Sequence, residues 1–268
     1  MLKQKLMAIA VAVGMSAGAQ AYMIDDFNTG DPTQIADAYL DASLTPTQRD
    51  EHYVGDGLPT DNNTATPPYS EYTMGGARDL YASRNVTAPN ASVGSGHSKT
   101  WNCATCGSLK FSQDPSQWGI HSVHWDGNAD GVFSTASTGL DEDFTDGGAS
   151  DTLYIDMFDV DHVYSVSFMV WDTSGLLSQY DWIDVAPHPG GSNHSVLSAS
   201  LTSFSGSADW SHIAAAQLLI DGQTNVDSES LDGQVDLVKT GSSVPAPATL
   251  ALMAMGLWGL TLARRRLA

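Results

Sequence analysis

The chain has 268 residues, with 11 lysines and arginines against 31 aspartates and glutamates, and its formal net charge is −20. Five of the basic residues lie in the two terminal segments and no acidic residue does. Between these segments 6 basic residues therefore face 31 acidic ones, a formal charge of −25. A protein of this charge repels nucleic acid and anionic lipid headgroups and attracts cations, which argues against nucleic acid as a partner.

Residues 1–21 have the features of a secretory signal peptide. Lys3 and Lys5 precede a short apolar block, and the segment ends with Ala19-Gln20-Ala21, a small-x-small cleavage site. The block is too short to span a bilayer. We therefore predict that the mature chain begins directly after Ala21, outside the cytoplasm.

The body of the chain, residues 22–243, has the pattern of β structure. In residues 163–170 one face of a strand would carry Tyr164, Val166, Phe168 and Val170, with smaller or polar residues between them. Residues 34–44 are the one candidate helix, and residues 50–72 are expected to be a long loop. Further predicted strands, separated by Gly, Asp, Asn, Ser and Pro, are 23–27, 77–83, 108–112, 121–125, 152–158, 180–185, 195–204, 214–221 and 234–239. Roughly ten short strands predict one all-β domain, a jelly-roll-like β-sandwich.

The sequence DGNADG at 126–131 is typical of the start of a calcium-binding loop. Asp126, Asn128 and Asp130 alternate before a glycine, so their oxygens can converge on one ion. The twelfth position is Ser137 rather than an acid, so further ligands would come from elsewhere, with Asp141, Glu142 and Asp143 as candidates. The alternative is a solvated turn between strands. We expect at most a structural Ca²⁺ site and no other cofactor.

The two cysteines and eight histidines offer little else for chemistry. Cys103 and Cys106 lack a second pair for zinc, so a small disulfide or two thiols at a strand end is expected. His121 and His124 would lie on opposite faces of one strand. His188 and His194 flank a loop, where they could approach each other and form a metal site; the alternative is solvated loop histidines.

Exposed tryptophans could form a platform for sugar rings. Trp125 and Trp171 lie within strand patterns and are expected in the core. Trp101 and Trp118 lie in a polar, loop-like context and are the better candidates for glycan binding. No G-x-S-x-G or H-E-x-x-H motif occurs, and nothing selects a pair of facing carboxylates, so no catalytic residue is predicted.

The C-terminal segment, residues 244–268, has the features of a membrane segment. An uncharged apolar run of 16 residues, from Ala248 to Ala263, follows a proline-rich hinge and precedes three arginines. Its length is slightly below the roughly 20 residues of a permanent span. The arginines favour an orientation with the domain outside and the chain end in the cytoplasm. We predict a transmembrane helix.

This tail resembles the PEP-CTERM sorting signal of Gram-negative bacteria. The resemblance rests on the prolines before the apolar run and the arginines after it, while Ala246 replaces the usual glutamate. It implies processing by the membrane protease-transpeptidase exosortase and delivery to the cell surface or exopolysaccharide matrix, after transient anchoring in the inner membrane. The residues of the motif are Val244, Pro245, Pro247, Arg264, Arg265 and Arg266.

The body carries a second, shorter resemblance. Its sequences IDDF (24–27), GGARDL (75–80), WDG (125–127) and VDL (235–237) look like those of exported jelly-roll domains found with such tails, many of them similar in shape to carbohydrate-binding modules. We interpret the protein as a non-enzymatic surface or matrix protein. The alternatives are a carbohydrate-binding module for extracellular polysaccharide and a matrix-remodelling glycoside hydrolase.

Overall fold

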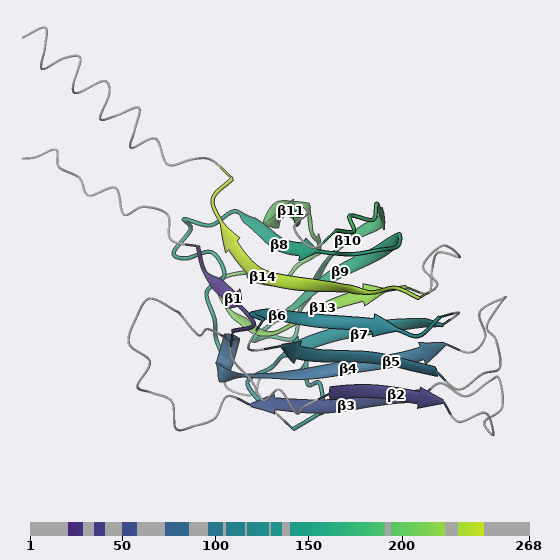
Figure 1. Cartoon of the computed structure of the whole chain (residues 1–268). Helices are drawn as coiled ribbons and strands as arrows, with labels where there is room; N and C mark the ends of the chain where they lie inside the picture. Colours follow the sequence, from purple (N-terminus) through teal and green to yellow (C-terminus); the bar gives the residue numbers. More distant parts are fainter. Residues whose placement is uncertain are drawn as a thin grey trace, which may run out of the picture.

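The strands of the protein form two antiparallel sheets (Figure 1). The computed structural model describes residues 21–28, 35–40, 50–57, 73–85, 96–103, 106–115, 117–128, 130–135, 140–190, 194–222 and 230–243. Sheet A contains, in spatial order, β11 (His194–Ser200), β8 (Thr152–Phe158), β14 (Gly233–Gly241), β6 (Ser108–Gln113), β5 (Gly96–Cys103) and β2 (Ile35–Leu40), with β1 (Met23–Asp25) paired to β14. Sheet B contains β12 (Ser205–Gly206), β10 (Leu177–Val185), β9 (Tyr164–Asp172), β13 (Ile213–Asp221), β7 (Trp118–Trp125), β4 (Ala77–Asn85) and β3 (Asp50–Gly57).

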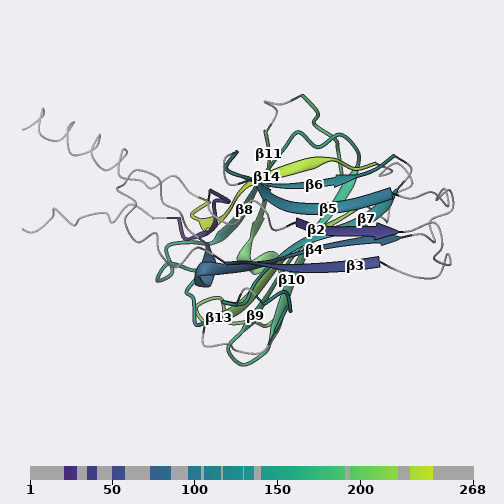
Figure 2. The same ribbon diagram turned by 60° about the horizontal axis from the view of Figure 1, so that its bottom comes forward.

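The two sheets pack face to face and share one apolar core, which makes the fold a jelly-roll-like β-sandwich, as the sequence predicts (Figures 1 and 2). Strand β9 shows why these residues form a sandwich. Its alternate residues from Tyr164 to Val170 are fully buried, and the residues between them are half-buried on the outer face.

Polar side chains also link the two sheets inside the sandwich. The ring of His121 on β7 lies 2.9 Å from the Thr100 hydroxyl and 3.0 Å from the Gln113 amide nitrogen, both on sheet A. Burial lowers the pKa of His121 to about 3, so the ring is neutral. His124 lies on the opposite face of β7, which confirms the prediction from spacing.

A second buried polar group joins three of the sequences that carry the body's resemblance. Asp25 of IDDF accepts hydrogen bonds from Arg78 of GGARDL at 2.6 and 2.7 Å and from the indole of Trp125 of WDG at 2.7 Å. The guanidinium of Arg78 also lies 5.3 Å from the ring centroid of Phe27. Three of the four short sequences behind the body's resemblance, although far apart in the chain, therefore meet at one point in the core.

The described chain begins and ends on the same side of the sandwich (Figure 1). The backbone N–H of Thr240, near the end of β14, donates to the carbonyl of Tyr22 at 2.9 Å. Two 3₁₀ turns, η1 (Met74–Gly76) and η2 (Leu201–Ser203), complete the described elements. Within the described ranges no helix is long and apolar enough to cross a membrane.

Two sequence predictions about secondary structure are wrong, and one further strand was not predicted. Residues 35–40, within the expected helix, form strand β2, and residues 50–57, within the expected loop, form strand β3. Strand β5 at 96–103 was not predicted. In all three segments the sequence has only a weak local preference for one secondary structure. Pairing of β2 with β5 and of β3 with β4 in the folded sheets therefore determines that these residues form strands.

Candidate functional site

A row of five side chains crosses the outer face of sheet B. Strand pairing places these residues opposite one another, one on each of five neighbouring strands. On each strand, the residues directly before and after the row residue point towards the core. Because side chains alternate between faces, the row points away from sheet A. From β4 to β10 it consists of Asp79, His124, Gln217, Met169 and Gln179.

A second row runs beside the first, two residues further along each strand. From β4 to β10 it consists of Tyr81, Ser122, Leu219, Ser167 and Asp181. Its exposed end is held by hydrogen bonds, because the Ser167 hydroxyl and the Gln179 amide donate to the same oxygen of Asp181, at 2.6 and 2.7 Å. The face therefore presents hydroxyl, amide and carboxylate groups in fixed positions.

Four aromatic rings cross the same face as a contiguous series. Tyr81 lies nearly parallel to His124, with ring centroids 6.4 Å apart and an interplanar angle of 21°. Phe133, from the loop after β7, lies 4.1 Å from His124 and 5.1 Å from Trp171 on β9. In this series, Tyr81–His124–Phe133–Trp171, the rings of Tyr81, Phe133 and Trp171 are half-buried and offer flat apolar surface, while His124 is only 3% exposed and contacts both Tyr81 and Phe133.

His124 is neutral and acts as a hydrogen-bond acceptor. Its Nε2 lies 2.8 Å from the Gln217 amide nitrogen and 2.8 Å from the Ser122 hydroxyl. An amide nitrogen can only donate, so Nε2 accepts. Burial lowers the pKa of His124 to about 3, which keeps the ring uncharged at neutral pH and fixes the orientation of Gln217.

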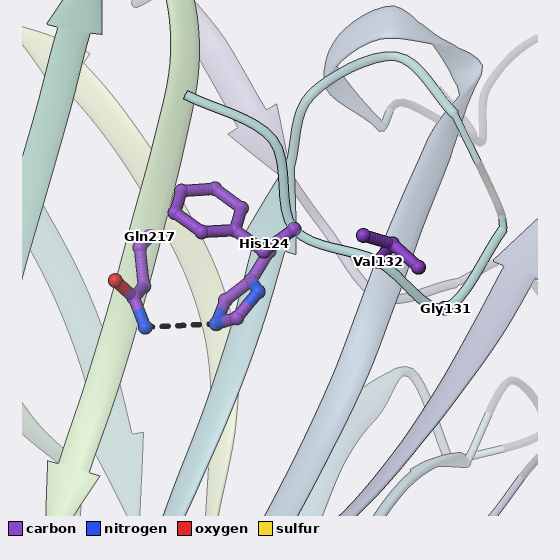
Figure 3. A pocket seen from close by; sticks show the side chains of 5 residues that line it. His124, Gly131, Val132 and Gln217 are labelled. Carbon is purple, nitrogen blue, oxygen red and sulfur yellow. Dashed lines mark hydrogen bonds between the residues drawn. The ribbon is translucent and has the colours of Figure 1, made fainter. Parts of the chain in front are cut away.

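A pocket of about 420 Å³ opens at the centre of this arrangement (Figure 3). Figure 3 shows the His124 and Gln217 side chains joined by their hydrogen bond, with the loop that carries Gly131 and Val132 beside them. Phe133 completes the lining. The volume lies within the range of small-molecule sites.

The loop that carries Phe133 is fastened to sheet B by carboxylates. Asp79 of β4 accepts a hydrogen bond from the backbone N–H of Gly131 at 3.0 Å, and Asp126 accepts one from Ser134 at 2.8 Å. Burial, together with the negative charges of Asp126 and Asp130, raises the pKa of Asp79 to about 6, although the backbone hydrogen bond from Gly131 opposes this rise. The Asp79 and Asp126 side chains therefore hold the loop over β4 and β7, and together with Asp130 they concentrate carboxylates at this point.

The predicted calcium ligands lie in this loop. Asp126 accepts hydrogen bonds from the Asn128 and Ser134 backbone, and Asp130 accepts one from the Val132 backbone. Asp79, from a different strand, adds a third carboxylate near Asp126 and Asp130, which the sequence did not single out. The calcium site stays a prediction, and Asp79 is its additional candidate ligand.

The two tryptophans predicted as a glycan platform are not brought together. Trp118 is only 1% exposed, at the start of β7, so its prediction as a surface residue is wrong. The apparent loop around it is the beginning of a strand, and the ring is covered. Trp101 is half-buried on β5 in sheet A, and its glycan-binding role stays a prediction.

Trp171, expected in the core, lies half-buried on the outer face. Trp125 is fully buried, as expected. The residues of the face that the sequence analysis missed are Tyr81, Phe133 and Gln217. For Trp171 a signal was present, because the alternation that buries Phe168 and Val170 turns Trp171 outward.

The cysteines and the remaining histidines are placed as follows. Cys103 and Cys106 form a disulfide at the end of β5, in agreement with the structural interpretation. His188 and His194 do not form a pair. His188 lies against the ring of Tyr164, with centroids 6.1 Å apart, while His194 contacts Asp156 at 3.0 Å.

The tail contains a recognised sorting motif. Residues 243–266 match the PEP-CTERM protein-sorting motif, so the chain carries this signal, which marks an exported protein. Its residues Val244–Pro247 and Arg264–Arg266 lie outside the described residues, as do Ala19 and the rest of the signal peptide up to Gln20. No curated protein matches the chain.

Solved structures similar to the chain include two of carbohydrate-binding modules from Clostridium thermocellum. The family 11 carbohydrate-binding module of a cellulosomal cellulase is 10% identical, with a TM-score of 0.37, and the match covers 85% of this chain and 97% of the module. A family 11 module in complex with a β-1,3-1,4-mixed-linked tetrasaccharide is 11% identical, with a TM-score of 0.34, and the match covers 78% and 97%. Fold, face and tail define an exported β-sandwich protein with a PEP-CTERM sorting motif.

Proposed function

We propose that the protein is a non-enzymatic carbohydrate-binding module whose outer face of sheet B binds a neutral extracellular polysaccharide. The observation that carries the proposal is the aromatic series Tyr81–His124–Phe133–Trp171 on a face that also presents amide, hydroxyl and carboxylate groups from Gln217, Gln179, Ser167 and Asp181. This was the first alternative from the sequence, and the geometry now favours it over a surface protein without a ligand.

A sugar ring has an apolar face of C–H groups and an edge of hydroxyls, and this face of the protein offers partners for both. Aromatic rings attract C–H groups through their negative faces. Amide, hydroxyl and carboxylate groups exchange hydrogen bonds with sugar hydroxyls. Gln217 and Gln179 supply both donors and acceptors, and Asp181 already holds its position through two hydrogen bonds.

The charge of the face selects neutral sugars. The two rows contain Asp79 and Asp181 and no lysine or arginine. A polysaccharide with carboxylate or sulfate groups would meet like charge here and in the protein as a whole. We therefore infer a chain of neutral pyranose rings.

The dimensions of the face favour a chain rather than a single sugar. From β4 to β10 there are four strand-to-strand steps, and at about 4.8 Å a step the rows extend over about 19 Å. The pocket beside His124 and Phe133 would accept one ring, and the remainder of the rows would contact its neighbours.

A glycoside hydrolase is the second candidate, because Asp79 combines a raised pKa with a position beside the pocket. Its carboxylate, however, is about 1% exposed and accepts the Gly131 N–H. The other acid of the rows, Asp181, lies four strands away, on the order of 19 Å, whereas paired glycosidase carboxylates are about 5 to 9.5 Å apart. Asp126 and Asp130 lie nearer to Asp79, but both accept hydrogen bonds from backbone N–H groups of the loop that they hold in place. Binding without turnover is the function this geometry supports best.

The test is binding of the purified chain to neutral glucans, measured by isothermal titration calorimetry with mixed-linkage glucan, laminarin and soluble cello-oligosaccharides. Alginate serves as the anionic comparison, and reducing-sugar release is assayed in parallel. Trp171→Ala removes an aromatic surface from the face, and Gln217→Ala removes an amide that can bond sugar hydroxyls. Each should weaken binding by tenfold or more, which corresponds to about 1.4 kcal/mol of binding free energy.

Trp101→Ala is the matched control, because it removes the same ring from sheet A. Binding that survives Trp171→Ala but is lost in Trp101→Ala would move the site to the other sheet. Absence of binding to these glucans and also to neutral galactomannan and xylan, or preferential binding of alginate, would contradict the proposal. Release of reducing sugar that disappears in Asp79→Asn would favour the hydrolase.

A further inference from the structure

Three metal-ligating side chains converge on the outer face of sheet A, away from the proposed glycan face. They are Asp156 on β8, His194 on β11 and Asp236 on β14, three adjacent strands. One ligand atom from each lies within 4.8 Å of the other two. Within the described part of the chain, this is the one group of three or more His, Cys, Asp and Glu residues that meets this distance.

The backbone directs Asp236 to this place. The pairing of β14 with β8 shifts between Val235 and Leu237, so Asp236 is the extra residue of a β-bulge. Val235 and Val238 are both fully buried, although they are three residues apart. Without the bulge, one of them would face outward. The irregularity thus brings a carboxylate next to Asp156.

The side chains are accessible and partly preorganised. His194 is 48% exposed and Asp156 is 21% exposed, and the His194 Nδ1 lies 3.0 Å from an oxygen of Asp156. The imidazole also stacks on Phe158, with ring centroids 5.2 Å apart and an interplanar angle of 21°. This stacking limits the positions that the ring can take.

The cluster carries excess negative charge. Burial raises the pKa of Asp236, and the charges of Asp156 and Asp26 raise it further, while His194 lowers it. A divalent cation among these groups would offset the repulsion between the carboxylates.

From this geometry we propose that Asp156, His194 and Asp236 form a site for a divalent transition-metal ion, with zinc as the best fit. Imidazole with two carboxylates suits zinc, at metal–ligand distances of about 2.0–2.2 Å. Calcium and magnesium prefer oxygen ligands alone. Small side-chain rotations bring atoms now within 4.8 Å to the separation that a tetrahedral ion requires, and water fills the remaining position.

The site would stabilise an edge of the sandwich. Strand β11 ends sheet A and pairs with β8 alone in the described sheet. An ion held by His194, Asp156 and Asp236 ties this edge strand to the two strands beside it. Because the ion binds the folded state, zinc should raise the unfolding temperature.

The test is a calorimetric titration of tag-free, chelator-treated protein with zinc chloride. We expect one zinc ion per chain and at least tenfold weaker affinity in His194→Gln and in Asp236→Asn. His212→Ala is the matched control, because His212 is also exposed and contacts a carboxylate, Asp141, at 2.7 Å. It should bind zinc as the wild type does.

A measurement on the wild type covers the case in which a variant does not fold. Substoichiometric Co²⁺ should shift the ring-proton resonances of His194 and leave those of His212 unchanged. Equal zinc affinity in wild type and His194→Gln, or cobalt shifts at His212 alone, would overturn the proposal. Displacement of zinc by equimolar calcium would overturn the choice of ion.

Discussion

Arg78 and Asp25 form a fully buried ion pair, with both carboxylate oxygens of Asp25 within 2.7 Å of the Arg78 Nη1. The backbone N–H of Phe27 and the indole of Trp125 donate to the same carboxylate at 2.8 and 2.7 Å. Burial raises the pKa of Asp25, while the Arg78 charge and these donors oppose that rise by favouring the ionised form. The pair connects β1, which belongs to sheet A, with β4 and β7 of sheet B.

The first prediction concerns the stability that depends on this pair. Asp25→Asn keeps the shape but removes the negative charge that lies against the buried Arg78 guanidinium, so the free energy of unfolding should fall by about 3–5 kcal/mol. Urea denaturation followed by tryptophan fluorescence measures it. Asp141→Asn, at an exposed pair with His212, should cost less than about 1 kcal/mol. Equal effects of the two substitutions would show that Asp25 is not a structural centre.

The sequence predicted most strands because their periodicity is local. The alternation in β9 and the short run of β8 identify a buried face without knowledge of the partner strand. Strands β2 and β3 were missed because they lie at sheet edges, where pairing with β5 and β4 determines the conformation. The convergence of Asp25 and Arg78 could not be predicted either, since it depends on how the two sheets pack.

The candidate face was only partly predictable. Trp171 could have been placed on it by extending the alternation of β9 by one residue. Gln217 and Tyr81 carry no sequence signal of their own, because their role depends on lying opposite His124 and Ser122 in the sheet. Phe133 comes from an irregular loop, whose path over β7 depends on the hydrogen bond between Gly131 and Asp79.

A second prediction concerns the sorting tail. A chain that ends at Ser243 should fold and be exported but not retained, because β14 ends at Gly241 and completes the described sheet. Mass spectrometry of surface-extracted full chain should find a C-terminus between Val244 and Pro247. The control is the same measurement in a strain that lacks exosortase activity. Recovery of surface protein that retains Arg264–Arg266 would mean a plain membrane anchor.

A third prediction follows from the raised pKa of Asp79, about 6 in the folded protein against 3.8 for an unperturbed aspartate. The native state therefore binds a proton that the unfolded chain lacks between these pH values. The stability contributed by Asp79 falls as pH rises through this window. In chelator, Asp79→Asn should raise the free energy of unfolding at pH 7 by on the order of 1–3 kcal/mol. This gain should disappear toward pH 4.

The control for this pH dependence has the opposite sign. Hydrogen bonds from Ser243 and Thr152 lower the pKa of Asp151, so its contribution to stability is present at neutral pH and lost as pH falls below 3.8. Asp151→Asn should therefore destabilise the protein at pH 7 and have a smaller effect in acid. Denaturation curves from pH 2 to 8 compare the three proteins. An Asp79→Asn effect that is constant over this range would show that Asp79 is not a buried, perturbed acid.

The last prediction is calcium binding at the loop after β7. Burial raises the pKa of Asp79, and the negative charges of Asp126 and Asp130 contribute to the rise, so calcium among these carboxylates would offset their repulsion of Asp79. Millimolar calcium should raise the unfolding temperature of the wild type relative to excess chelator. The shift should be lost in Asp126→Ala/Asp130→Ala and reduced in Asp79→Asn. Substitution of Asp236→Asn on the opposite sheet should leave it unchanged, which separates this site from the proposed zinc site. A wild-type unfolding temperature that does not respond to chelator, or a full shift in the double variant, would mean that the loop is a turn held by backbone hydrogen bonds to Asp126 and Asp130 without an ion.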